Sequence, residues 1–283
     1  MNNLSVVEQL SYSTVQICAE ASAGVSCGTG FVMSFRETDK NWCPVLVTNG
    51  HVVDSANRIS LCFTKKSPNG DPDGKVSVTK DVRECGLVYH PQYVCGTDTD
   101  LCAIPLAPFV SSIEQTGQEV FFAHFPLDLL ASDEDYAALM QLDEVAMVGY
   151  PNALIDTVNN QPIFRRGVLA TNPSLDYEGR KEFLTDIATI GGSSGSPVLY
   201  INNGFSVNKR NGSIQIGGSE CKLLGVHRGG FRYDAMGRLV KIVTPEMVKD
   251  VPRTQIPINL GLVIKVHRIK ELVRQFVGEL QND

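Results

Sequence analysis

Residues 191–197 read GGSSGSP, so that Ser194 lies within a glycine-rich turn. Glycine allows the backbone to turn sharply, and such a turn can direct the N–H groups of Gly192 and Ser194 toward one point. A serine hydroxyl becomes a useful nucleophile only when an imidazole takes its proton and a carboxylate orients that imidazole. The segment therefore requires a histidine and an acid elsewhere in the chain.

A histidine and an aspartate precede this serine in suitable surroundings. His51 lies in LVTNGHVV (46–53), at the end of an apolar segment typical of a strand, and Asp100 lies in DTDL (98–101). Each segment alone would be weak, because a histidine after an apolar strand is usually structural. The three together, in the order His51, Asp100, Ser194, predict a base, an orienting carboxylate and a nucleophile.

These segments resemble those of chymotrypsin-fold serine endopeptidases, and within them the glutamyl endopeptidase branch. Close variants of that branch's motifs occur as TNGHVVD (48–54), DLCA (100–103), TIGGSSGSPV (189–198) and GVHRGG (225–230). The motifs match closely, but the sequence between them does not. The resemblance therefore consists of separate short matches spread over residues 24–280. The resemblance implies a serine endopeptidase that hydrolyses peptide bonds through an acyl-enzyme intermediate.

The resemblance also implies an all-β fold of two six-stranded antiparallel β-barrels with a C-terminal α-helix. The chain has 283 residues with 25 Gly and 14 Pro, which suits many short strands and turns. We expect four segments, namely an N-terminal barrel with His51 and Asp100 (1–112), a connection with a short helix (113–142), a C-terminal barrel with Ser194 and the specificity pocket (143–264), and a terminal helix (265–283).

Local patterns place the helices and one long loop. Ser132 followed by three acids can cap a short helix. Apolar residues at helical spacing after Lys265 predict a terminal helix packed on the second barrel. The polar stretch 202–218 lies between two strands and is interpreted as a long loop.

Near the serine, the resemblance implies a pocket for an acidic side chain. It assigns Thr189 and His227 to binding Glu at P1, since a hydroxyl and an imidazole can donate hydrogen bonds to a carboxylate and a protonated imidazole adds attraction. The alternative for His227 is a satisfied core histidine. Ala188 stands where an acid would select Lys or Arg, so tryptic specificity is not expected.

Two further features concern substrate binding and activation. Gly229 and Gly230 would leave a strand edge free to pair with the substrate backbone. Digestive relatives bury a new N-terminal ammonium beside an Asp directly before the nucleophile, but here that residue is Ser193. A neutral hydroxyl cannot hold a buried ammonium as a carboxylate can. Control by a regulatory protein partner, a ligand or an ordering loop is expected instead.

Charge and termini limit the partners and the compartment. The net charge is −6, which disfavours a nucleic-acid partner and a polybasic membrane patch, so the expected partner is a protein or peptide substrate. Residues 1–8 lack the basic and apolar regions of a secretory signal, and we therefore expect a cytoplasmic protein.

The cysteines and histidines give no metal or cofactor signal. Secreted relatives often bridge a cysteine before the Gly-rich strand to one directly after the catalytic histidine. Cys27 fits the first place, but Val52 occupies the second, so the eight cysteines are expected to be free thiols. The absence of Cys-x-x-Cys and His-x-x-x-His spacings predicts no metal site, and no cofactor is expected.

Two other functional classes are compatible with parts of this pattern. A catalytically silent peptide-binding pseudoprotease is the first, although an intact triad argues against it. A serine esterase of the α/β-hydrolase type is the second, but it needs the order Ser, Asp, His and a glycine where Ser196 stands.

Overall fold

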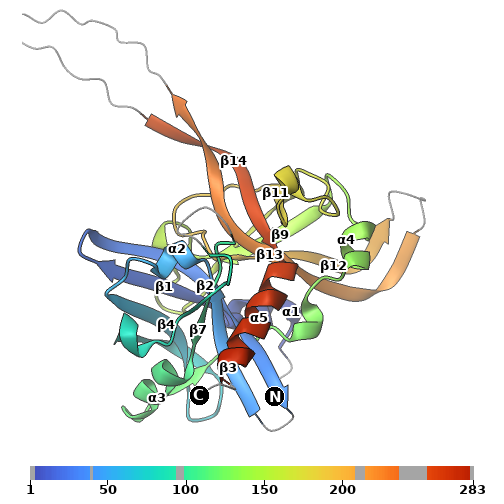
Figure 1. Cartoon of the computed structure of the whole chain (residues 1–283). Coiled ribbons are helices and arrows are strands. Elements are labelled where there is room, and N and C mark those ends of the chain that lie inside the picture. The colour runs from blue at the N-terminus through green and yellow to red at the C-terminus, as the bar shows by residue number, and fades with distance from the viewer. Residues whose placement is uncertain (1–3, 39–40, 94–98, 208–213, 236–253, 281–283) are drawn as a thin grey trace, which may run out of the picture.

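A computed structural model describes residues 4–38, 41–93, 99–207, 214–235 and 254–280 of the chain. Antiparallel strands make up two halves, with short helices between them and a longer helix at the C-terminal end (Figure 1). The mainly β architecture predicted from the sequence is confirmed.

The N-terminal half is an eight-stranded sheet with the order β5-β4-β1-β2-β3-β7-β6, to which β8 adds by pairing with β4. Its strands are β1 (Thr14–Ala21), β2 (Gly24–Thr38), β3 (Asn41–Thr48), β4 (Arg58–Lys66), β5 (Pro72–Asp81), β6 (Val88–Tyr89), β7 (Cys102–Pro105) and β8 (Glu119–Phe121). A closed six-stranded barrel was predicted here, but no ladder among the described residues joins β5 to β6. The two-residue β6 pairs with β7 alone among the described strands.

The C-terminal half is a closed barrel of six strands, as predicted, with the order β10-β11-β14-β13-β12-β9. Its strands are β9 (Glu144–Gly149), β10 (Ile163–Leu169), β11 (Glu182–Asp186), β12 (Pro197–Val207), β13 (Ile214–Ala235) and β14 (Thr254–Lys265). The sequence pattern did not predict β11. Closure means that β10 and β11, which carry few apolar residues in alternation, are paired on both sides.

Two ribbons of this half extend beyond the predicted strands. The stretch 202–218 was predicted as a loop, but its described residues, 202–207 and 214–218, continue the β12–β13 ladder from Asn202↔Glu220 to Val207↔Ile214. β13 and β14 also remain paired out to Ala235↔Thr254 and project from the barrel (Figure 1). A two-stranded ribbon outside a barrel needs no apolar face, which is why polar residues misled the prediction.

The two predicted helices are present. Ser132 caps α4 (Asp133–Ala138) through a reciprocal capping box, and α5 (Val266–Leu280) ends the described chain. Three further helices were not predicted, namely α1 (Val6–Ser13), α2 (Gly50–Val53) and α3 (Ala107–Glu114). Short 3-10 turns are η1 (Val82–Glu84), η2 (Leu127–Leu129), η3 (Pro151–Ala153) and η4 (Tyr177–Gly179).

Helix α5 packs on both halves of the molecule rather than on the second barrel alone. Its Phe276 meets Phe35 of β2 edge to face, with ring centroids 5.4 Å apart. Glu271 accepts a hydrogen bond from the buried His90 of the first half at 3.0 Å. One hydrophobic core includes residues of β2, β3, β9 and α5, so the helix closes a core that the two halves share.

The expectation that all eight cysteines are free is wrong for one pair. Cys18 of β1 and Cys27 of β2 lie directly opposite each other in the antiparallel ladder and form a disulfide. Their Cα atoms are 4.2 Å apart because the β1–β2 turn brings the two strands together at this register. Cys43, Cys62, Cys85, Cys102 and Cys221 are free, and Cys95 lies outside the described residues.

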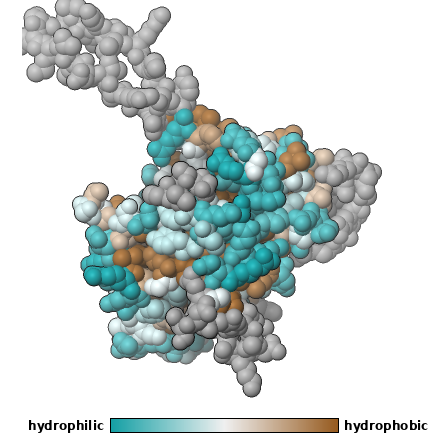
Figure 2. Space-filling view, viewed as in Figure 1, coloured by the Kyte–Doolittle hydropathy of each residue, from teal (hydrophilic) through white to brown (hydrophobic). Residues whose placement is uncertain are grey.

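The surface is mixed in character. Hydrophilic residues cover most of the face shown in Figure 2, with apolar residues in smaller areas between them. Among the described helices, none is long and apolar enough to cross a membrane.

Candidate active site

The structure brings His51 and Asp100 into direct contact. The Nδ1 atom of His51 lies 2.5 Å from Oδ2 of Asp100, and the His51 backbone N–H donates to Oδ1 of the same carboxylate at 2.9 Å. Asp100 is 1% exposed, whereas 41% of the His51 side chain is exposed. An Nδ1 that donates to the carboxylate leaves Nε2 as the acceptor on the open side of the ring.

Strand register explains this contact. Thr48 ends β3 and pairs with Cys102, which begins β7, so the two strand ends lie side by side. His51 follows the first strand within the turn α2, and Asp100 precedes the second. Asn49 fixes the junction because its side-chain amide donates to the Asp100 carbonyl at 2.8 Å.

The loop that carries Ser194 is held by Thr29 of the first sheet. The Thr29 backbone N–H donates to the Ser194 carbonyl at 2.8 Å, and its hydroxyl donates to the Gly192 carbonyl at 2.9 Å. Gly195 has φ +85°, and a Cβ at this position would lie 1.9 Å from the Thr29 carbonyl oxygen. Only glycine therefore fits where the loop meets the sheet.

The Ser194 hydroxyl lies beside the cleft that contains the histidine. Its Oγ donates to the Arg228 carbonyl at 3.2 Å, and no hydrogen bond in the described structure joins it to His51. The cleft has a volume of about 340 Å³ and is lined by His51, Asp100, Arg228, Gly229, Gly230, Phe231 and Leu262. The predicted base (His51), the predicted acid (Asp100) and the strand edge at Gly229 and Gly230 thus line one cleft. The Ser194 hydroxyl forms its hydrogen bond with Arg228, a residue of the cleft wall.

The predicted oxyanion-hole donors are not used within the protein. Neither Gly192 N–H nor Ser194 N–H donates a backbone hydrogen bond in the described part of the chain, whereas both neighbours do. Ser193 N–H donates to the Ile190 carbonyl at 3.1 Å, and Gly195 N–H donates to the His227 carbonyl at 2.8 Å. The two predicted donors remain available to an incoming oxygen.

Thr189 and His227, the predicted specificity residues, are both buried and incompletely bonded. They are 4% and 1% exposed, and among the described residues neither the Thr189 Oγ1 nor the His227 Nδ1 has a hydrogen-bond partner. A Cβ at Gly230 would lie 2.1 Å from that hydroxyl oxygen, so Thr189 lies behind the glycine edge of the cleft. The His227 ring packs against Gly261 on the neighbouring strand.

The charge on His227 differs from one possibility raised by the sequence. Burial, together with the positive charge of Arg165, lowers the His227 pKa to about 3. The imidazole is therefore neutral near pH 7 in the unliganded protein. A protonated His227 does not supply positive charge to the pocket in this state.

Sequence reasoning missed two arginines near the site. Arg165 donates to the Ala188 carbonyl and, at 2.7 Å, to the Ser193 hydroxyl. Arg228 lies with its Nε 3.7 Å from Oδ2 of Asp100 and its Nη1 3.1 Å from Oε1 of Glu182. Neither role has a sequence signal of its own, because both depend on which face of a strand the side chain occupies.

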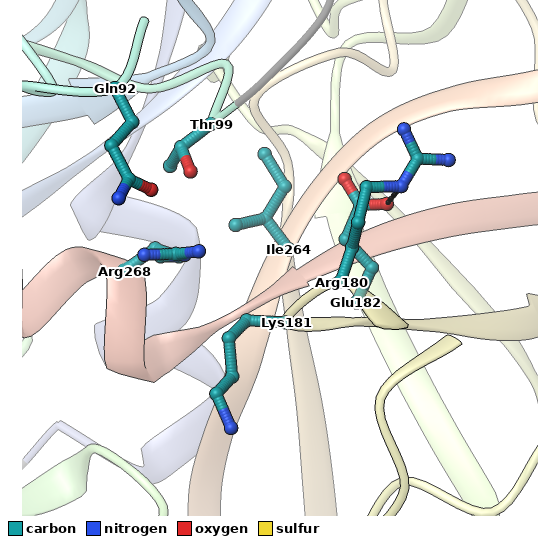
Figure 3. Close-up of a pocket in the computed structure, with 7 residues that line it drawn as sticks. All are labelled: Gln92, Thr99, Arg180, Lys181, Glu182, Ile264 and Arg268. Carbon is teal, nitrogen blue, oxygen red and sulfur yellow. Dashed lines mark ion pairs between the residues drawn. The ribbon is translucent and has the colours of Figure 1, made fainter. Parts of the chain in front are cut away.

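A second pocket lies next to the segment that carries Asp100, because the preceding residue, Thr99, lines it. It has a volume of about 410 Å³ and is lined by Gln92, Thr99, Arg180, Lys181, Glu182, Ile264 and Arg268 (Figure 3). Arg180 pairs with Glu182, Lys181 with Asp176 and Arg268 with Glu271. Since each cation already has an acid, this pocket is not strongly positive. Groups of residues that could hold a metal ion are absent from the described residues.

The fold and the serine loop place the protein in the class of chymotrypsin-fold serine proteases. The family model described as a trypsin-like peptidase domain matches residues 28–206, which is more than half of the sequence, and the chain therefore belongs to this family. The matched range includes His51, Asp100 and Ser194 and ends before His227.

Several solved structures are similar to the chain. The serine endoprotease from Yersinia pestis has 16% identity and a TM-score of 0.47, covering 97% of this chain and 68% of that one. The HtrA-type protease AlgW with a tripeptide has 14% identity and a TM-score of 0.46, covering 96% and 62%. A serine-to-alanine variant of Rv3671c from M. tuberculosis, in an inactive form, has 15% identity and a TM-score of 0.45, covering 95% and 89%. A comparison with curated protein sequences found no match.

Proposed function

We propose that the chain is a serine endopeptidase that uses Ser194, His51 and Asp100 and prefers an acidic residue, Glu before Asp, at P1. The observation that carries this proposal is the buried Asp100 holding an exposed imidazole at 2.5 Å in a cleft whose wall bonds the serine hydroxyl. Membership of the trypsin-like peptidase family supports the reaction class.

The first chemical step is proton transfer from serine to histidine. Rotation about the Cα–Cβ bond releases the Ser194 hydroxyl from the Arg228 carbonyl, and a substrate backbone can then occupy that strand edge. His51 Nε2 takes the hydroxyl proton as Oγ attacks the scissile carbonyl carbon. Asp100 stabilises the resulting imidazolium without itself becoming protonated.

The remaining groups act on the tetrahedral intermediate. The free N–H groups of Gly192 and Ser194 donate to the developing oxyanion, and one such donor is worth about 10²–10³-fold in rate. His51 then gives its proton to the leaving amine, which produces the acyl-enzyme. Water hydrolyses this ester by the same steps with His51 again acting as the base.

A glutamate side chain suits the unpartnered groups at the pocket wall. The Thr189 hydroxyl and a neutral His227 that carries its proton on the nitrogen facing the ligand can each donate one hydrogen bond to a carboxylate. A hydrogen bond to a charged group contributes about 1.5–3 kcal/mol. Two such bonds would favour Glu over an apolar residue of the same size by about 10²-fold or more.

Active-site labelling and digestion of a peptide library test this function. A fluorophosphonate probe should label the native protein and fail to label Ser194→Ala, while His51→Ala should lower kcat on a Glu peptide by about 10⁴-fold or more. His267→Ala is the matched control, because this histidine bonds the exposed Asp133 and lies outside the cleft. Full labelling of Ser194→Ala would refute Ser194 as the nucleophile. Cleavage mainly after Lys, Arg or large apolar residues would refute the acidic P1 preference.

A peptide-binding protein without catalysis is the second candidate. The observation that favours it is the Ser194 hydroxyl bonded to the Arg228 carbonyl rather than to His51. In this case the native protein would bind Glu peptides in calorimetry but react with the fluorophosphonate probe no faster than Ser194→Ala. Normal labelling of the native protein excludes this candidate.

A further inference from the structure

Two neighbouring arginines of β10 lie on opposite faces of the strand. Arg165 pairs in register with Met147, whose side chain is 1% exposed, and it therefore lies on the core side. Arg166 forms an ion pair with Glu144, and 72% of its side chain is exposed. The first arginine is thus placed toward the serine loop, and the second toward solvent.

Arg165 holds the segment that forms the back of the specificity pocket. Its guanidinium donates to the Ala188 carbonyl and to the Ser193 hydroxyl, the two ends of the stretch that includes Thr189. The Ile190 N–H donates to the same hydroxyl at 3.4 Å, so the segment closes around the guanidinium. Desolvation lowers the Arg165 pKa, but a guanidinium remains charged throughout the range of protein titrations.

Three buried polar atoms of Arg165, Thr189 and His227 have no hydrogen-bond partner within the described part of the chain. They are the Nε of Arg165, the Oγ1 of Thr189 and the Nδ1 of His227, and the last two belong to side chains that are at least nine-tenths buried. The pocket therefore has hydrogen-bonding groups that the folded protein leaves unused. A buried polar group without a partner is costly, which indicates that a ligand completes the set.

We propose that Arg165 is a specificity-determining residue whose positive charge, behind Thr189 and His227, selects a carboxylate over an uncharged side chain at P1. This inference rests on the proposed function and adds the source of charge to it. His227 is neutral, so its hydrogen bond alone would serve Gln nearly as well as Glu. The arginine supplies the attraction that only a carboxylate can use.

The expected size of the effect follows from Coulomb's law. At an effective dielectric constant near 20, two unit charges within about 10 Å of each other interact strongly enough to change a binding ratio by on the order of tenfold or more. Because the charge is fixed, the preference for Glu over Gln should stay constant from pH 6 to 9. A charge on His227 would instead make the ratio fall as the pH rises.

The test compares kcat/KM for matched Glu, Gln and Leu peptides in the full-length protein. Arg165→Met should lower the Glu-to-Gln ratio about tenfold, and Arg165→Lys should keep most of it because the charge remains. Arg166→Met is the matched control, and its ratio should equal that of the native protein. Fluorophosphonate labelling of every variant reports whether the serine loop is still competent.

The outcomes distinguish failure of the proposed acidic P1 specificity from failure of the proposed role of Arg165. A native protein that does not prefer Glu over Gln refutes the acidic specificity and the role of Arg165 with it. A native preference for Glu that persists in Arg165→Met refutes the role of Arg165 alone. Loss of labelling in both Arg165 variants also overturns it, because the arginine would then position the serine loop rather than select the substrate.

Discussion

Acidification should destabilise this protein through one buried histidine. His227 is 1% exposed, and burial lowers its pKa from an ordinary 6.5 to about 3. Below pH 6.5 the unfolded chain binds a proton at this position and the folded chain does not. Proton binding to the unfolded chain then favours unfolding. The contribution of the neutral imidazole to the free energy of unfolding is therefore fully present above pH 6.5 and is lost as the pH falls toward 3.

The magnitude follows from the two pKa values. Each unit of difference corresponds to 1.36 kcal/mol, so a fall from pH 7 to pH 5 should lower the free energy of unfolding by about 2 kcal/mol through His227 alone. His227→Gln removes this contribution because an amide does not titrate. Other acids and bases titrate equally in the two proteins and cancel in the comparison.

Urea unfolding at pH 7 and pH 5 measures the difference. Both proteins should carry Ser194→Ala, so that self-cleavage does not disturb the baselines. The protein with His227 should lose about 2 kcal/mol more than the Gln variant over this interval. Equal losses in the two proteins would show that His227 has the same pKa in the folded and unfolded chains and becomes protonated in the folded state over this interval. That result would also remove the argument for Arg165 as the source of charge.

Three further changes test the structure elsewhere. Cys18→Ser should lower the free energy of unfolding by about 2–3 kcal/mol through loss of the short disulfide loop, and an unchanged urea midpoint would contradict the bridge. Phe276→Ala should cost about 3–5 kcal/mol, since its ring packs on Phe35 in the shared core; thermal unfolding that matches the native protein would contradict this packing. Glu182→Gln should lower kcat/KM on the order of tenfold, because Arg228 loses this ion pair and interacts more strongly with Asp100, the acid proposed to orient His51. Unaltered kinetics would show that this ion pair is irrelevant to the reaction.

The parts of the site that depend on local sequence could be predicted. The contact between His51 and Asp100 follows two strand ends that the apolar segments already indicate. The serine loop is likewise encoded by its glycines. In each case the candidate site residue lies within a few positions of a strand end. The same short segment therefore determines both which residue is present and where it lies in the fold.

The parts of the site that depend on strand pairing, and on which face of a strand a side chain occupies, could not be predicted. Arg165 and Arg166 are chemically identical neighbours, and only the register with β9 decides which one reaches the serine loop. The glycine pair Gly28 and Gly30 around Thr29 was a usable signal, since it indicates a close approach of two segments, but it does not say which segment approaches.

The disulfide was predictable in principle. The β1–β2 turn pairs Ala21 with Gly24, and the same register places Cys18 opposite Cys27. The pattern of secreted relatives instead places the partner of Cys27 at the position of Val52, and that pattern does not consider the β1–β2 hairpin. The missing β5–β6 pairing among the described residues, in contrast, has no signal in the sequence of either strand.

The hold of Thr29 on the serine loop has a consequence for biosynthesis. The loop is part of the second half of the chain, yet its carbonyl groups at Gly192 and Ser194 are bonded to a residue of the first sheet. A growing chain that has completed only its first half has a histidine and an acid but no nucleophile. Under the proposed function, a chain released before both halves have docked would therefore be unable to cleave its neighbours, because the site is assembled only when both halves have folded together.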